Sequence, residues 1–296
     1  MIMQESVLRV EPSREETLSK LIAFSHEGPM DLNDSLPWHL GIDRARPPKQ
    51  PEHCWLYGTP THAGLTPEQR LELLWLQIAR DVSMFIALEQ TIPVLYVGYL
   101  NRYEQALPPD ICEYLMIFSK EEIVHTLVFK RYMAMAGLPL YERDASVAFA
   151  LGQLPNMHPV AGILFTLIIE WTAELGAMHS TQADDIDPFT RQMFHRHHVD
   201  EARHIAFAKW IVEAYFLNES PERVEPLREM VRQQIKRLLP TYTYAAAIAQ
   251  YASFDFPVRT DDLPLIRSIW NSPANTELNQ RRLAPMLAWL KKLEMS

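Results

Sequence analysis

The sequence is poor in cysteine and glycine and has no long run of apolar residues. Its 296 residues include only Cys54 and Cys112, too few for a disulfide framework or a thiolate metal site. A bound metal would therefore depend on His and carboxylate side chains, and a reducing cytoplasmic location is expected. The most apolar stretch, 159–169, is too short to span a bilayer and is followed by Glu170, so we expect no membrane association.

Basic residues are fewer than acidic residues. The chain has 28 Lys and Arg against 37 Asp and Glu, a formal net charge of −9. No stripe of Lys and Arg is visible, which argues against a nucleic-acid partner.

Prolines are abundant, 22 against 9 glycines, and they cluster in connections, which favours helices joined by stiff turns. Apolar residues recur every three or four positions, and no segment alternates with period two. The pattern predicts an all-α fold in which four long helices form two hairpins. The helices are expected at about 67–102, with a kink at Pro93, and at 111–135, 159–182 and 188–217.

The helices are expected to form one domain with three parts. Residues 1–65 read as a loop-rich N-terminal prelude and 66–218 as a four-helix bundle. Residues 219–296 carry weaker helical signals around an aromatic stretch and are expected to pack on the bundle. These C-terminal helices are predicted at about 221–238, 262–271 and 277–293.

Each predicted hairpin carries one Glu-x-x-His pair, midway along its second helix. The pairs are Glu122 with His125 and Glu201 with His204. The first helix of each hairpin supplies a Glu within an apolar face, Glu89 or Glu170. Glu89 precedes Glu122 by 33 residues and Glu170 precedes Glu201 by 31, so the two hairpins repeat one layout.

Distances from the turns support this ligand set. Glu170 and Glu201 are nearly equidistant from the turn between their helices, whereas Glu104 would be offset from Glu122 by roughly 15 Å, at 1.5 Å of rise per residue. A Glu from each of two helices plus Glu-x-x-His from the other two is the ligand set of a dinuclear carboxylate site in a helical bundle. Without a cation, burying these carboxylates would be costly.

His197 adds a third imidazole. It lies four residues before Glu201 and seven before His204, so all three share one helical face. The corresponding position of the first hairpin holds Phe118. His195 and His198 point elsewhere on the helix and are expected at the surface or between helices.

The motifs LEQ at 88–90, EEIVHT at 121–126, Glu170 and H-x-x-D-E-x-x-H at 197–204 resemble the di-iron arylamine oxygenases of the p-aminobenzoate N-oxygenase type. The resemblance covers about 70–210 and implies a ferritin-like bundle with additional C-terminal helices. By this resemblance, seven residues hold the metals: Glu89, Glu122, His125, Glu170, His197, Glu201 and His204.

Three further acids lie beside the ligands in the sequence. Glu121 and Asp200 each precede a ligand Glu, and we expect Glu121 to accept a hydrogen bond from His204 and Asp200 one from His125. Glu174, one turn beyond Glu170, is expected to be a supporting acid or an alternative ligand. The sequence does not identify the residues that bind substrate.

The resemblance implies a dioxygen-dependent oxygenase with two iron ions, an external electron donor or donor protein, and a small-molecule substrate, most simply an amine that is N-oxygenated. C–H hydroxylation, desaturation, oxidative C–C cleavage and a radical-generating subunit remain alternatives, and metal storage fits the chain length badly. The sequence leaves open the substrate, the donor, Fe/Fe against Mn/Fe loading, and whether the chain forms a homodimer.

Overall fold

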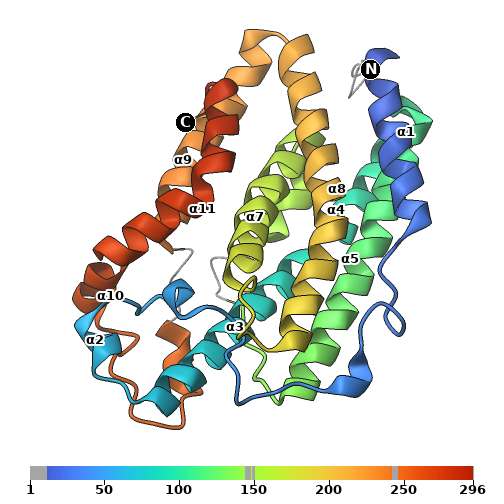
Figure 1. Cartoon of the computed structure of the whole chain (residues 1–296). Coiled ribbons are helices and arrows are strands. Elements are labelled where there is room, and N and C mark those ends of the chain that lie inside the picture. Colours follow the sequence, from blue (N-terminus) through green and yellow to red (C-terminus); the bar gives the residue numbers. More distant parts are fainter. Residues whose placement is uncertain (1–11, 144–147, 149–150, 242–245, 296) are drawn as a thin grey trace.

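The computed structural model describes residues 12–143, 148, 151–241 and 246–295, and this part of the chain contains helices and no strand (Figure 1). The all-α fold class is therefore confirmed. Its centre consists of four long helices, α3 (Pro67–Glu89), α5 (Pro109–Ala136), α7 (Pro159–Ser180) and α8 (Pro188–Asn218). In Figure 1, α7 and α8 run side by side, with α5 beside them.

Local signals in the sequence explain where these helices begin and end. Each begins with proline, whose fixed φ suits the first helical position and whose missing N–H is not needed there. The side chain of Asp187 caps α8 by accepting a hydrogen bond from the Thr190 N–H. Gly137 ends α5 in the left-handed conformation, with φ of 61°.

The first predicted helix, 67–102, is divided in the structure. The helix α3 ends at Glu89, and α4 (Ile92–Tyr103) begins three residues later with Pro93 in its first turn. Proline cannot donate to the carbonyl four residues before it, which here is that of Glu89, and its ring would clash with that carbonyl. The expected kink is therefore a break, placed directly after a predicted metal ligand.

The N-terminal part contains more helix than a loop-rich prelude would. The helix α1 (Pro12–Glu27) packs along α5 and α8, and α2 (Pro60–Ala63) is a single turn. Residues 1–11 lie outside the described part of the chain. Short 3₁₀ turns connect the main elements at Trp38–Leu40, Pro51–His53, Glu104–Ala106, Leu154–Asn156 and Ala246–Gln250.

The C-terminal part consists of α9 (Pro221–Thr241), α10 (Leu263–Trp270) and α11 (Pro273–Lys292), close to the predicted helices. The helix α11 packs against α7, on the side of the bundle away from α1 (Figure 1). Residues 242–245 of the aromatic stretch lie outside the described residues. Because both terminal parts pack on the central helices, we propose that the chain forms one domain.

The helix α7 is the most apolar element of the fold. Among the described residues it is the one helix whose length and composition would suit a membrane span, but 89% of its apolar window is buried inside the protein. It also carries buried Glu170 and Glu174. It is therefore a core helix, and it brings two carboxylates to the centre of the bundle.

Candidate metal centre

All the predicted ligands are buried where the four central helices meet. Glu89 is the last residue of α3, while α5 supplies Glu122 and His125, and α7 supplies Glu170. Positions three, four and seven apart share one face of a helix, which is why α8 presents three of its side chains together. The set from α8 is His197, Glu201 and His204, and none of the seven side chains is more than 4% exposed.

One carboxylate oxygen of Glu201 lies close to a nitrogen of each of three imidazole rings. The Oε1 atom of Glu201 is 3.2 Å from Nδ1 of His125 and 3.3 Å both from Nε2 of His197 and from Nδ1 of His204. The rings come from two different helices, α5 and α8. Each ring therefore has one nitrogen facing a common carboxylate.

Glu122 and Glu89 each contact a different ring of this cluster. Oε1 of Glu122 is 3.0 Å from Nδ1 of His204, and Oε1 of Glu89 is 3.0 Å from Nε2 of His197. Two sets of possible ligand atoms result, each with all its atoms within 4.8 Å of one another. They are Glu89, His125, His197 and Glu201, and Glu122, His125, Glu201 and His204. The two sets overlap at His125 and Glu201. Nδ1 of His125 can bind only one cation, whereas the carboxylate of Glu201 has two oxygens and can contact two.

Glu170 belongs to neither set but lies in the same electrostatic environment. Burial raises the pKa of its carboxyl well above the ordinary value, and the neighbouring carboxylates of Glu122 and Glu201 raise this pKa further. Both of its oxygen atoms are buried and have no hydrogen-bond partner among the described residues. Its carboxyl group is therefore free to bind a cation that would also neutralise its neighbours.

The inner carboxylates, Glu89, Glu122, Glu170 and Glu201, fit a pair of metal ions. Both oxygens of Glu122, Glu170 and Glu201 and one oxygen of Glu89 are buried without a hydrogen-bond partner among the described residues. Buried polar atoms are normally paired, and unpaired buried charge is costly. Two divalent cations carry a charge of +4, which would balance the −4 of four ionised carboxylates. Oxygen and imidazole donors of this kind suit iron and manganese.

The second nitrogen of two rings faces an acid outside the inner set. Nε2 of His204 is 2.7 Å from Oε2 of Glu121, and Nε2 of His125 is 3.2 Å from Oδ2 of Asp200. These are the two pairs expected from the sequence. When such a ring is neutral, an N–H donated to the acid leaves Nδ1 unprotonated and directed at the centre, which is the tautomer that a metal ligand requires.

Glu174 supports the third ring in the same way. Its Oε2 atom is 3.2 Å from Nδ1 of His197, and its Oε1 atom is 2.7 Å from Nδ1 of His198. His198 therefore lies between α7 and α8, while His195 is exposed. Together, Glu121, Asp200 and Glu174 are termed the outer acids below.

The charges at the centre shift the pKa values of the metal-free protein strongly. Burial alone would raise the pKa of Glu201, but the surrounding imidazoles of His204 and His197 lower it well below the ordinary value. Burial and the neighbouring Glu201 raise the pKa of Glu122 to about 7. Burial and the positive charge of His197 oppose protonation of His125, yet a hydrogen bond to Asp200 and the nearby carboxylate of Glu201 raise its pKa to about 9. The centre thus holds protons where a metal would otherwise supply positive charge.

Sequence reasoning missed the cations around the outer acids. Arg203 donates to both Glu121 and Asp200, and Arg196 donates to Asp200. A local signal was present, because Arg203 lies three residues after Asp200 and therefore on the same side of α8. A buried acid next to a basic residue at this spacing indicates an ion pair.

Comparison with protein-family models matches residues 11–255 to the family described as P-aminobenzoate N-oxygenase AurF. No individually curated protein matches the chain. The matched span contains every inner carboxylate, imidazole and outer acid described above, and it confirms the resemblance carried by the sequence motifs. The chain therefore belongs to the p-aminobenzoate N-oxygenase AurF family, whose enzymes are di-iron oxygenases that use dioxygen to N-oxygenate an amine.

Proposed function

We propose that the four inner carboxylates and the rings of His125, His197 and His204 hold the two iron ions of this oxygenase. The observation that carries the proposal is the convergence of buried carboxylate oxygens without hydrogen-bond partners on three inward-facing imidazole nitrogens. When bound, the di-iron pair supplies the electrons that reduce dioxygen. An external reductant restores them, as the balance R–NH₂ + O₂ + 2e⁻ + 2H⁺ → R–NHOH + H₂O requires.

Aromatic side chains keep water away from this centre. The ring of Phe118 stacks on His204, with centroids 3.6 Å apart, and Phe85 and Phe129 pack against His197. An apolar surround limits solvent access and strengthens the electrostatic interactions inside it. The outer acids fix the orientation of each ring, so these residues prepare the site before substrate enters.

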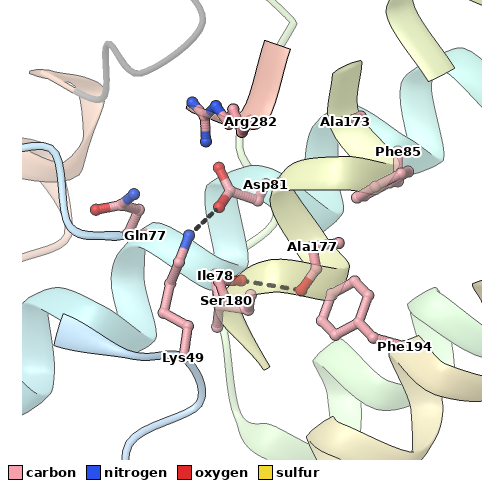
Figure 2. Close-up of a pocket in the computed structure, with 11 residues that line it drawn as sticks. Lys49, Gln77, Ile78, Asp81, Phe85, Ala173, Ala177, Ser180, Phe194 and Arg282 are labelled. Carbon is pink, nitrogen blue, oxygen red and sulfur yellow. Dashed lines mark hydrogen bonds and ion pairs between the residues drawn. The ribbon is translucent and has the colours of Figure 1, made fainter. Parts of the chain in front are cut away.

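A narrow cavity beside Phe85 supports a route for substrate (Figure 2). Its apolar end is lined by Phe85, which also contacts His197, together with Phe194 and two alanines. Its polar end contains Lys49, whose Nζ is 2.7 Å from Oδ2 of Asp81, and Arg282. The cavity measures about 20 Å³, the size of one water, so a substrate enters by displacing the side chains at its mouth.

The charge of the polar end favours an amine that carries an anionic group. Lys49 and Arg282 are each only 5% exposed, and Lys49 forms an ion pair with Asp81. Burial and the positive charges of Lys49 and Arg282 lower the pKa of nearby His53 to about 3. We therefore propose that a carboxylate binds at this end and the amine lies toward the metals.

The two buried free cysteines are in keeping with our further proposal of a cytoplasmic location.

The test is iron loading followed by turnover. We expect about two iron atoms per chain and, with a chemical reductant and ¹⁸O₂, a product from 4-aminobenzoate that carries labelled oxygen on nitrogen. A ring-hydroxylated product, or a protein that holds no iron, would contradict the proposed function. The methyl ester of the same amine should be a poorer substrate. Lys49→Met should raise KM for the acid and not for the ester, whereas the exposed Lys120→Met serves as the control.

A further inference from the structure

Arg203 is a buried cation that the proposed ligand set does not use. It is 7% exposed and lies on α8, one residue before His204. Its Nη2 atom donates both to Oε1 of Glu121, at 2.9 Å, and to Oδ1 of Asp200, at 2.7 Å. The remaining oxygen of each acid is the atom that faces His204 or His125. A continuous chain of hydrogen bonds thus joins two ligand rings from different helices through one guanidinium group.

The same guanidinium contacts the N-terminal segment. Its Nε atom is 2.9 Å from Oγ of Ser25, near the end of α1, and Ser25 is 3% exposed. Two neighbouring contacts repeat the connection. Arg196 donates both to Oδ1 of Asp200 and to the carbonyl of Gly28, and the N–H of Met30 donates to Oδ2 of Asp200. Residues 25–30 therefore cover Asp200 and the guanidinium group that joins Asp200 to Glu121.

The chemistry of this junction requires arginine. Two buried carboxylates next to one another repel, and the cation between them offsets the cost of their burial. The planar guanidinium donates in several fixed directions at once, so it reaches both acids and the Ser25 hydroxyl. A lysine ammonium in the same place would keep the charge but not this arrangement of donors.

We propose that Arg203 is a positioning residue that couples the orientation of the His125 and His204 rings to the docking of residues 12–30. Metal binding and docking of this segment then stabilise each other, because coupling between two equilibria is reciprocal. The proposal rests on the proposed metal site. It adds that metal bound at that site stabilises the docked N-terminal segment.

The test compares amide hydrogen exchange of the full chain without metal and with saturating Mn²⁺, which binds oxygen and imidazole ligands without the need to exclude air. In the wild type, metal should slow exchange in residues 16–30 as well as in α5 and α8. In Arg203→Lys, metal affinity should fall by roughly 10 to 100-fold, as for other lost partners of ligand side chains. Even at saturation, the protection of 16–30 should be absent in that variant.

Arg131→Gln is the matched control. Arg131 also connects α5 to the N-terminal part of the chain, through the Leu32 carbonyl and the Trp38 ring, but it does not touch the outer acids. It should keep the metal-dependent protection of 16–30. Ser25→Ala, a milder change outside the metal site, should still weaken Mn²⁺ binding by roughly two- to tenfold, the effect of one lost hydrogen bond.

The outcomes separate the two proposals. A wild-type protein that binds no metal would overturn the proposed site. A protein that binds metal and protects α5 and α8, but leaves 16–30 unchanged, would overturn the coupling alone. The coupling would equally be overturned if Arg203→Lys kept full protection of 16–30, or if Ser25→Ala bound Mn²⁺ as the wild type does.

Discussion

Replacing Glu170 with leucine is expected to stabilise the metal-free protein and to impair metal binding. Without metal, both carboxyl oxygens of Glu170 are buried and have no hydrogen-bond partner among the described residues, and burial raises the pKa of the group well above its ordinary value. An unsatisfied buried polar group costs roughly 1–3 kcal/mol. Leucine has a similar volume and no polar atom, so Glu170→Leu should recover about that amount. For a chain of this length, the melting temperature of the metal-free protein should rise by roughly 2–6 °C.

Calorimetry with and without iron measures both effects. The wild type should gain stability on anaerobic iron loading, because a ligand that binds only the folded state stabilises it. Glu170→Leu should hold less than two iron atoms and gain less. Glu113→Gln, an exposed change on α5, should alter neither quantity. The reasoning would be refuted if Glu170→Leu melted below the wild type without metal and still bound two iron atoms after loading.

Three further outcomes are expected. His197→Ala should lower iron content and abolish oxygenation, whereas the exposed His195→Ala should match the wild type in iron content and turnover. Glu121→Ala should keep the helical circular dichroism spectrum but weaken iron affinity by roughly 10 to 100-fold, measured by chelator competition; unchanged affinity would argue against its contact with the ligand ring. In the metal-free protein, the raised pKa values of Glu122, about 7, and His125, about 9, mean that folding retains protons which the unfolded chain loses. The contribution of these two groups to the stability of the metal-free protein should therefore decline as pH rises from about 4.5 through 9. The increase in melting temperature on iron loading should become larger over the same range. An increase that does not change with pH would contradict this reasoning.

The sequence alone determined the helices and the kinds of atom at the centre. Proline at the first position and a side-chain cap or glycine at an end fix local backbone geometry, so α5, α7 and α8 lie within a few residues of their predicted bounds. Helical periodicity likewise assigns His197, Glu201 and His204 to one face without any knowledge of the fold. The repeated hairpin layout then indicates which Glu of α3 and α7 faces them.

Only the tertiary structure decided which side chains from distant parts of the chain meet. Ser25 and Arg203 are 178 residues apart and Met30 and Asp200 are 170 apart, yet both pairs are hydrogen-bonded. The cations at the polar end of the cavity come from the N-terminal loop and from α11, with Lys49 beside Asp81 of α3. Periodicity specifies the face on which a residue lies but not the height or rotation at which two faces pack. Those are set by the side chains that fill the space between the helices, which is why α11 could be predicted as a helix but not placed against α7. The helix α1 was not predicted, because residues 1–65 were expected to be rich in loops.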